Sequence, residues 1–268
     1  MALFDDIAAT YDKEFTFTAV GKAQRLQVYH HIDGIISAPK SLDILELNCG
    51  TGEDALYFSS KGHRITATDI SVEMLEVLRS KIVAKKEKAD ITVKQLDIKE
   101  IGSFYSEKSF DVVFSNFGGL NCLNPEEINQ LSQNLPQLLK PGGTFIAVVM
   151  PELCLWESIY FLLKLRFADI FRRKKKFENA SISNHVTVPT FYYAQGKLEN
   201  LFSDQFKKES IAPVGFFIPP SYLNSIFQTR PLLVKALQWL DLRLPKSSFF
   251  ASASDHFIVC YKLKSTKI

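Results

Sequence analysis

The sequence predicts an α/β fold built on a mostly parallel sheet, and three observations lead to this prediction. Between Ser41 and Met150, short apolar runs of strand length alternate with stretches of helical periodicity. The first run ends in a glycine-containing loop that leads directly into a helical stretch, which is typical of parallel sheets. With 268 residues, of which 46% are hydrophobic, the chain is long enough to bury one substantial core.

The expected elements of this first part follow one another in a regular order. The strands are expected at Asp43–Leu47, Arg64–Thr68, Ile91–Gln95, Phe110–Ser115 and Gly143–Val149. The helices between them are expected at Glu53–Lys61, Ser71–Lys85 and Pro125–Leu139. Ser71 is suited to cap the second helix, and Leu139-Lys140-Pro141-Gly142-Gly143 is expected to form a helix stop and a tight turn before the fifth strand.

After Met150 the regular alternation ends. The expected elements are one long helix over Pro151–Phe177, a strand at His185–Tyr193, a short helix at Gly196–Phe202, a strand at Lys207–Val214, a helical region from Pro219 to about Leu244, and a strand at His256–Leu263. The last two strands are expected to return to the sheet. The segments between them are then insertions over its carboxyl edge.

Aromatic side chains are concentrated in this second part. Residues 151–268 hold 20 of the 33 aromatic residues, where an even distribution would give about 14 or 15. We interpret the excess as a helical, aromatic-rich cap that lines an apolar pocket in addition to filling a core.

The net charge of +3 is too small to indicate a nucleic-acid binder. The window Phe161–Ala180 alone has seven Lys or Arg and two Asp or Glu, so it carries +5 and the rest of the chain sums to −2. The basic segment Arg172–Lys176 is a candidate for holding an acidic group or for peripheral contact with an anionic membrane. A solvated helix end is the alternative.

Neither a metal site nor a disulfide framework is expected. Cys49, Cys122, Cys154 and Cys260 show no CxxC spacing and no nearby histidine cluster. The N-terminus carries acids where a signal peptide is basic, and no run of eighteen uncharged apolar residues occurs. We therefore expect a reducing, cytoplasmic location.

The loop after the first strand indicates a ligand site. Its sequence is Glu46-Leu47-Asn48-Cys49-Gly50-Thr51-Gly52, and Gly50 and Gly52 allow a ligand to approach the backbone closely. The loop alone is also compatible with a dinucleotide-binding motif. However, Glu46 would repel a pyrophosphate and would favour a ligand with a cationic group.

Two further carboxylates are expected at the same edge of the sheet. Asp69 ends the second strand, nineteen residues after Gly50, where it can accept hydrogen bonds from a ribose diol. Asp97 follows the third strand and can accept from the amino group of a purine. Three acids at successive strand ends, without Lys or Arg among them, indicate an adenosine that carries positive charge, as S-adenosylmethionine does.

These segments resemble class I S-adenosylmethionine-dependent methyltransferases. The resemblance rests on Glu46–Gly52, Asp69–Leu75, Leu96-Asp97, Phe110–Val113 and Leu139–Gly143, which follow the family's order over about 110 residues. The opening Phe4–Asp12 is similar to the segment that covers the cofactor in ubiquinone/menaquinone-type methyltransferases. Asn48 stands where the family usually has its first glycine, and Asn tolerates a left-handed backbone.

The resemblance implies a Rossmann-like, doubly wound domain over residues 1–268, with a seven-stranded, mostly parallel sheet and an antiparallel last strand. It implies a helical arm at 1–40, a cofactor-binding core at 41–150, cap insertions at 151–205 and 215–253, and final strands at 206–214 and 254–264. It also implies S-adenosyl-L-methionine as the cofactor. The expected cofactor-binding residues are Tyr11, Glu46, Asn48, Gly50, Gly52, Asp69, Ile70, Met74, Asp97, Ile98, Asn116 and Phe117.

The expected acceptor is a small hydrophobic or aromatic molecule, such as a quinone-like or lipid-like metabolite, and not a nucleic acid. Candidate substrate contacts are Asn121, His185, Tyr192 and Tyr193. Methyl transfer from a sulfonium requires alignment of the reactants and exclusion of water, so the sequence identifies no catalytic residue. An NAD(P)-dependent oxidoreductase and a non-catalytic S-adenosylmethionine-binding protein remain alternatives, and the oligomeric state stays open.

Overall fold

A seven-stranded sheet forms the centre of the computed structural model, which describes residues 4–37, 40–85, 89–104, 108–181 and 187–265. The strand order is β3-β2-β1-β4-β5-β9-β8. The bounds are β1 Asp43–Leu47, β2 Arg64–Asp69, β3 Ile91–Gln95, β4 Phe110–Ser115, β5 Leu139–Val149, β8 Phe206–Val214 and β9 His256–Leu263. Strand β9 is antiparallel to β5 and β8, and the neighbouring pairs among β1 to β5 are parallel. The predicted α/β sheet with an antiparallel last strand is confirmed.

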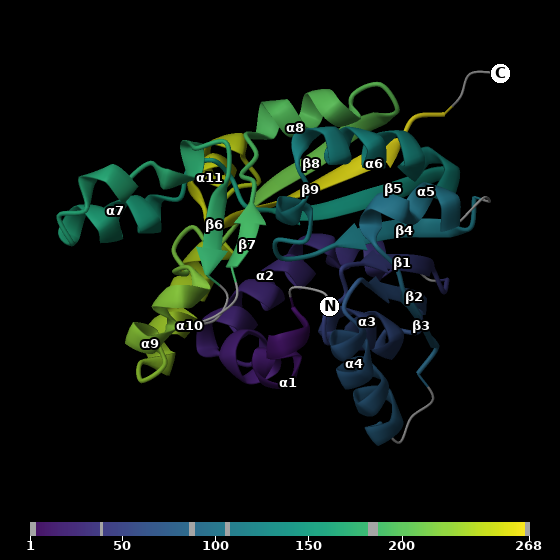
Figure 1. The fold of residues 1–268 in the computed structure, drawn as a ribbon, viewed down its shortest axis with the longest axis horizontal. Coiled ribbons are helices and arrows are strands. Elements are labelled where there is room, and N and C mark those ends of the chain that lie inside the picture. The colour runs from purple at the N-terminus through teal and green to yellow at the C-terminus, as the bar shows by residue number, and fades with distance from the viewer. Residues whose placement is uncertain (1–3, 38–39, 86–88, 105–107, 182–186, 266–268) are drawn as a thin grey trace.

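Helices cover both faces of this sheet (Figure 1). One face is covered by α2 (Ala19–Ile36), α3 (Glu53–Ser60) and α4 (Val72–Ala84), and the other by α5 (Ile101–Phe104), α6 (Pro125–Leu138) and α8 (Gln195–Phe202). Successive residues of β1 point to opposite faces, so Ile44 joins the core beneath α2 while Leu45 joins the core beneath α6. The two cores hold the strand ends in fixed positions.

The helix bounds agree closely with the sequence-based prediction in the first half of the chain. The side chain of Ser71 accepts from the backbone N–H of Met74 at 3.1 Å, so the expected cap of α4 is confirmed. The expected helix stop is confirmed, because α6 ends at Leu138, but the expected tight turn is wrong, because β5 already begins at Leu139 and incorporates Pro141-Gly142-Gly143. Gly142 takes a φ of 70° there, and the pairing of β4 with β5 shifts register at this end of the sheet.

The prediction of one long helix over Pro151–Phe177 is also wrong. Helix α7 covers only Leu155–Leu163, and Leu165 then takes a left-handed backbone with a φ of 57°. Two short 3₁₀ turns follow, the second at Arg172–Lys174. The physical reason is a long-range ion pair: buried Glu157 binds Arg172 and Arg173, which folds the basic segment back against α7.

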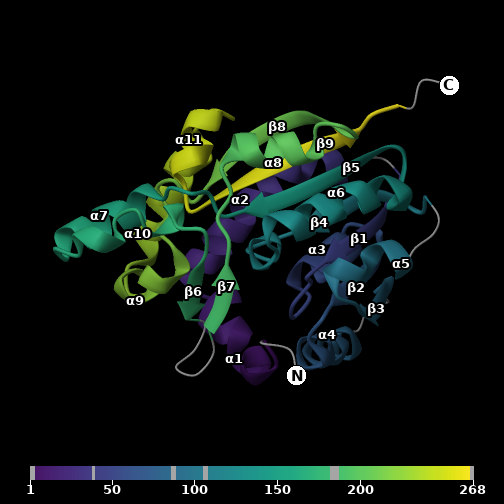
Figure 2. The same ribbon diagram turned by 45° about the horizontal axis from the view of Figure 1, so that its top comes forward.

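The remaining segments form the cap at one end of the sheet (Figures 1 and 2). They are α7, the hairpin of β6 (Glu178–Ser181) and β7 (Thr187–Thr190), α9 (Asn224–Phe227), α10 (Pro231–Asp241) and α11 (Ser248–Ala253). The strand expected at His185–Tyr193 is thus shorter, and the helical region after Pro219 is split in two. Within the ranges that the structure describes, none of the helices is both long and apolar enough to span a bilayer.

The N-terminal arm, residues 4–18, packs against α4. It contains the single turn α1 (Ala8–Tyr11). Ile7 and Ala8 of the arm bury Met74 of α4 in a small apolar cluster. Helix α2, which follows the arm, packs its Val20 and Ala23 against the cap.

Candidate functional site

The loop after β1 has an unusual backbone that brings it close to β4. Asn48, Gly50 and Gly52 have φ values of 48°, 52° and 80°, all in the left-handed region that glycine adopts most easily. The Asn48 side chain fixes this geometry, because its Nδ2 donates to the carbonyl of Asn116 at 2.8 Å and its Oδ1 accepts from Ser115 at 2.6 Å. Asn48 therefore takes the place of a glycine and also ties β1 to β4.

Asp69 lies directly against this loop. Its Oδ2 accepts from the N–H of Gly50 at 2.8 Å, and its Oδ1 accepts from the N–H of Ser71 at 2.9 Å. Burial raises the pKa of Asp69, although the backbone hydrogen bonds oppose this. Asp97 is half-buried two residues beyond β3, where it caps a short 3₁₀ turn through Lys99. Both carboxylates lie at the carboxyl edge of the sheet, as expected.

Glu46 is a buried carboxylate with an unsatisfied oxygen. The residue is 1% exposed, and its Oε2 has no hydrogen-bond partner among the described residues. Burial, followed by the nearby Asp54 carboxylate, raises the pKa of Glu46 well above its usual range. A buried acceptor without a partner is costly, so a bound donor or cation would stabilise this site.

An ion pair that the sequence analysis missed lies over the loop. Arg25 of α2 binds Asp54 of α3, with Nη1 and Oδ1 2.5 Å apart. Tyr29 and Asn116 also donate to Asp54, at 2.7 and 2.9 Å. The Arg25 guanidinium lies 5.2 Å from the ring centre of Phe117, and its buried Nε has no partner among the described residues. One feature of the sequence could have drawn attention to Arg25: it is the only arginine before Arg64.

The cavity enclosed by these groups measures only about 40 Å³. Its lining residues are Tyr11, Arg25, Asn48, Cys49, Gly50, Thr51, Glu53, Asp54, Asn116 and Phe117. Three polar contacts hold the arm over it: Thr51 donates to Asp12 at 2.6 Å, Lys81 pairs with Asp12 at 2.5 Å, and Ser71 donates to Asp5 at 2.6 Å. The structure thus has the arm closed on the glycine loop.

The apolar residues expected near the cofactor differ from one another in exposure and in position. Ile70 is 47% exposed and Ile98 is half-buried, both just beyond strand ends. Met74 is buried against the arm, because Ile7 and Ala8 cover it, and it does not line the cavity at the glycine loop.

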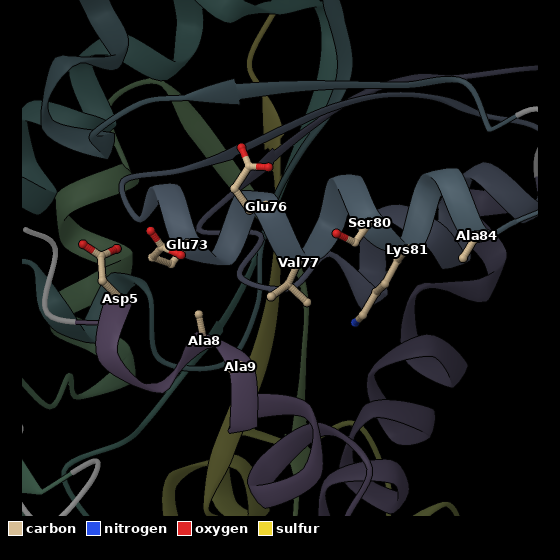
Figure 3. A pocket seen from close by; sticks show the side chains of 9 residues that line it. All are labelled: Asp5, Ala8, Ala9, Glu73, Glu76, Val77, Ser80, Lys81 and Ala84. Carbon is tan, nitrogen blue, oxygen red and sulfur yellow. The ribbon is translucent and has the colours of Figure 1, made fainter.

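A larger hollow of about 470 Å³ lies between the arm and α4 (Figure 3). Its lining includes Ala8, Glu73, Val77 and Lys81. None of the residues expected to bind the cofactor lines it, and it lies along the side of α4 rather than at the strand ends. The candidate site is therefore the smaller cavity at the glycine loop.

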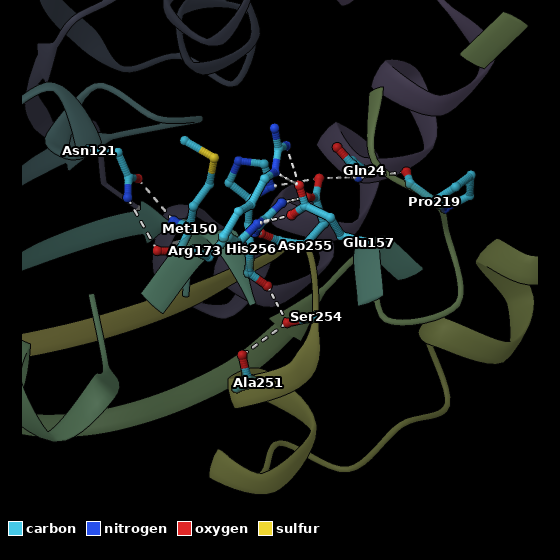
Figure 4. Close-up of polar contacts among 11 residues, drawn as sticks. Gln24, Asn121, Met150, Glu157, Arg173, Pro219, Ala251, Ser254, Asp255 and His256 are labelled. Carbon is cyan, nitrogen blue, oxygen red and sulfur yellow. Dashed lines mark hydrogen bonds and ion pairs between the residues drawn. The ribbon is translucent and has the colours of Figure 1, made fainter. Parts of the chain in front are cut away.

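Two of the expected substrate contacts make hydrogen bonds within the fold. Asn121 donates to the carbonyl of Met150 and accepts from its N–H (Figure 4), and it also donates to the carbonyl of Phe191, so both of its donor hydrogens are used. The Tyr193 hydroxyl donates to the carbonyl of Leu123. Tyr192 is buried with its ring 5.2 Å from the Arg173 guanidinium. His185 lies outside the described residues.

A buried network of charged residues lies beneath the cap (Figure 4). Arg173 is 4% exposed; it donates to Glu157 and, at 2.8 Å, to Oδ1 of Asp255. Gln24 donates to the other oxygen of Asp255 at 3.0 Å. Burial alone would raise the pKa of Asp255, but His256 and Arg173 outweigh it and hold that pKa below its usual range. Arg172 and Arg173 are thus not part of an exposed basic surface, contrary to expectation.

His256 connects this network to the candidate site. Its Nδ1 lies 3.2 Å from Oδ2 of Asp255, and its ring centre lies 5.3 Å from that of Phe117. His256 begins β9, which is antiparallel to β5, so it lies at the edge where β5 ends. The sequence analysis missed it because only the observed strand order brings Asp255 and His256 to this edge.

Part of the chain is similar in sequence to known methyltransferases. A family model described as a methyltransferase domain matches residues 44–143. A demethylmenaquinone methyltransferase of Clavibacter sepedonicus is 28% identical over 145 residues, 54% of this chain and 55% of that protein. The putative methyltransferase YqeM of Bacillus subtilis (strain 168) is 32% identical over 111 residues, 41% of this chain and 43% of the relative. A tRNA 5-carboxymethoxyuridine methyltransferase of Escherichia coli (strain K12) is 22% identical over 142 residues, 52% of this chain and 53% of the relative. The chain thus matches about half the length of these relatives.

Solved structures agree over most of the chain. The CcbJ methyltransferase from Streptomyces caelestis superposes with a TM-score of 0.65 at 15% identity and covers 98% of each chain. An S-adenosylmethionine-dependent methyltransferase from Methanosarcina mazei gives a TM-score of 0.59 at 16% identity, over 86% of this chain and 96% of the other. At such low identity the likeness concerns the fold.

Proposed function

Residues 44–143 form a methyltransferase domain of the class I S-adenosylmethionine-dependent type, and from this premise we propose that the protein transfers a methyl group from S-adenosylmethionine to a small, hydrophobic or aromatic acceptor. One observation carries the proposal furthest: the acidic strand ends and the Arg25–Asp54 ion pair surround the same loop. Together they offer the charges that this cofactor requires.

The residues at the loop fit the cofactor chemically. When bound, S-adenosylmethionine supplies an activated methyl group on a positively charged sulfur. Its amino-acid end carries one ammonium and one carboxylate, which match Asp54 and Arg25 respectively. Asp69 is suited to the ribose hydroxyls and Asp97 to the adenine amino group. Among the described residues that line the cavity, Arg25 alone is cationic, and it is already paired, so a pyrophosphate would lack a free cation.

The closed arm implies a conformational step. A cavity of about 40 Å³ has room for about one water molecule, so the cofactor requires displacement of the arm. The arm is held by a few polar contacts of Asp5 and Asp12 and by its small apolar cluster on Met74, which is separate from the two cores of the sheet. We propose that residues 4–18 open to admit the cofactor and close over it, which places Tyr11 against it and excludes water.

The proposed acceptor site lies beside the paired rings of Phe117 and His256, under the cap insertions 151–205 and 215–253. Several aromatic residues of the second half, including Phe202 of α8, Phe206 of β8 and Tyr261 of β9, belong to the core over the sheet, so only part of the aromatic excess is free to line a pocket. Asp255 lies 3.2 Å from Nδ1 of His256, and in this proposal His256 takes a proton from an acceptor hydroxyl or amine. The aromatic side chains that the core does not use favour a quinone-like acceptor over an RNA.

Binding of the two candidate cofactors tests the proposal against the oxidoreductase alternative. Titration calorimetry of the intact chain with S-adenosylmethionine and with NADH measures both affinities directly. We expect binding of S-adenosylmethionine and no heat from NADH, because the already paired Arg25 leaves no free cation for a pyrophosphate among the described residues that line the cavity. Binding of NADH alone would contradict the proposal.

A further inference from the structure

We propose that the exposed apolar side chains of α7 and of the turn after it dock the protein on an anionic lipid bilayer. We define the α7 surface as Leu155, Ile159, Leu162, Leu163, Leu165, Phe167 and Phe171, which are between 41% and 77% exposed. Single exposed apolar residues are ordinary, but seven within one short segment indicate an interaction site.

The pattern along α7 shows that this exposure belongs to one face. Leu155, Ile159 and Leu162 are spaced by four and three residues, so they lie on one side of the helix, with Leu163 beside them. Glu157 and Phe161 lie on the opposite side and are buried. A surface helix of a globular domain usually presents polar residues to water on its outer face. The outer face of α7 is apolar instead, so it is suited to contact with an apolar environment.

The position of α7 makes this face accessible. Both ribbon views show α7 at the outer end of the cap, projecting from the body of the molecule (Figures 1 and 2). The side chains at its end and just beyond are the most exposed of the surface, with Leu163 at 77% and Leu165 at 74%. These tips would enter the bilayer first.

The charges around the α7 surface match anionic headgroups. Lys164 and Arg166 lie within it, and exposed Lys174, Lys175 and Lys176 follow it. The acids nearby are Asp169 and Glu178, which leaves five positive charges against two negative ones. Leucine and phenylalanine that insert below a ring of basic residues are the usual composition of a peripheral membrane contact.

The same charges argue against a second copy of this chain as the partner. A twofold symmetric dimer through the α7 surface would place the basic residues of both copies in one interface. Lys164 and Arg166 would then face like charges beside a desolvated apolar contact, which is unfavourable. A bilayer with negative headgroups can bury the apolar side chains of the α7 surface and also pair with the basic side chains around it.

The α7 surface is also fixed relative to the candidate acceptor site. Glu157, on the inner face of α7, binds Arg173, and Arg173 binds Asp255 next to His256. Docking would therefore hold the cap and the acceptor site close to the lipid, where an apolar acceptor is concentrated. The supply of an apolar acceptor from the lipid rests on the proposed function, whereas the docking itself does not.

Co-sedimentation with vesicles tests the docking. The intact protein is mixed with vesicles of phosphatidylcholine alone or of phosphatidylcholine with phosphatidylglycerol, and the bound fraction is measured. The test variant is Leu163→Asp; the matched control is Val83→Asp, because Val83 is an aliphatic residue of α4 that is 85% exposed. We expect binding to the anionic vesicles, a loss of at least about tenfold with Leu163→Asp, and less than about twofold with Val83→Asp.

Three outcomes would overturn the proposal: no binding of the wild-type protein to anionic vesicles, equal binding of Leu163→Asp, or a wild-type dimer that Leu163→Asp converts to a monomer without any vesicle binding. Light scattering measures the oligomeric state and so detects the third outcome. Calorimetry with S-adenosylmethionine separates this proposal from the proposed function, since Leu163→Asp leaves the cofactor site untouched. Vesicle binding by a protein that does not bind the cofactor would refute the function and leave the docking in place.

Discussion

Asn48 and Gly119 compete for one small space beside the end of β1. A Cβ atom added at Gly119 would lie 2.0 Å from Cγ of Asn48, well inside the distance that two carbon atoms tolerate. The Asn48 side chain cannot move away without losing its hydrogen bonds to Ser115 and Asn116. Gly119 is therefore required because residue 48 carries a side chain.

This relationship predicts a strong coupling between the two positions. Gly119→Ala alone is expected to lower the free energy of unfolding by about 1–3 kcal/mol, because the added methyl group overlaps the Asn48 amide. In an Asn48→Gly background the same change is expected to cost less than about 1 kcal/mol, since the space is then empty. Urea denaturation of the four proteins measures the coupling, and additive losses would contradict it.

Asp69 is predicted to hold the ribose of S-adenosylmethionine. Asp69→Ala is expected to weaken binding by about 1–3 kcal/mol, because two ribose hydroxyls lose their acceptor. Asp69 also binds the backbone at Gly50 and Ser71, so thermal unfolding is measured beside the calorimetric titration. An unchanged affinity in a folded variant would place the ribose elsewhere.

Arg25 is predicted to bind only the amino-acid end of the cofactor. Arg25→Gln is expected to weaken S-adenosylmethionine at least about tenfold, because a buried charged hydrogen bond is lost. Binding of 5′-methylthioadenosine, which lacks the amino-acid end, is expected to change less than about twofold. Arg79→Gln is the control, because Arg79 is an exposed arginine that is also paired with an acid. Equal weakening of both ligands would show that Arg25 acts on the fold instead.

His31 is predicted to make stability fall at mildly acidic pH. Burial lowers the pKa of His31 to about 4, with smaller contributions from Lys246 and His30. The unfolded chain, with a histidine pKa of about 6.5, binds a proton that the folded chain excludes, so stability is lost as pH falls from about 6.5 to about 4. Between pH 7 and pH 5 this amounts to about 2 kcal/mol.

Chemical denaturation at the two pH values checks this contribution. The loss between pH 7 and pH 5 is expected to be about 2 kcal/mol smaller in His31→Gln than in the wild type. His30→Gln is the matched control, since His30 is exposed. The same pH dependence in wild type and His31→Gln would contradict the assignment.

The first half of the fold follows from local sequence. The strands β1, β3 and β4 and the cap of α4 by Ser71 depend on short-range patterns, and so do the carboxylates at the strand ends. Asp69 could be placed beside Gly50 from the sequence because both follow neighbouring parallel strands.

The parts that were missed depend on contacts between distant residues. Arg25 meets Asp54 only because α2 packs across α3, and His256 meets Phe117 only because β9 is antiparallel. The long helix expected over Pro151–Phe177 is broken because Glu157 binds two arginines that follow it by more than ten residues. Local periodicity contains no information on such pairs.

His256 is predicted to support the transfer step without binding the cofactor. His256→Gln is expected to slow methyl transfer to an acceptor that must lose a proton by about 10²-fold or more, with an unchanged affinity for S-adenosylmethionine. His30→Gln, an exposed histidine, is expected to change neither quantity. A parallel loss of cofactor affinity in His256→Gln would assign His256 to the fold.

The fate of a labelled methyl group tests the central claim most directly. The intact protein is incubated with S-adenosylmethionine labelled in its methyl group and an extract of the source cells, and the label is then measured in the small-molecule, protein and RNA fractions. Transfer to a small, organic-soluble molecule is the result that the proposed function predicts. Label in RNA or protein, or binding of the cofactor with no transfer to any fraction, would contradict it.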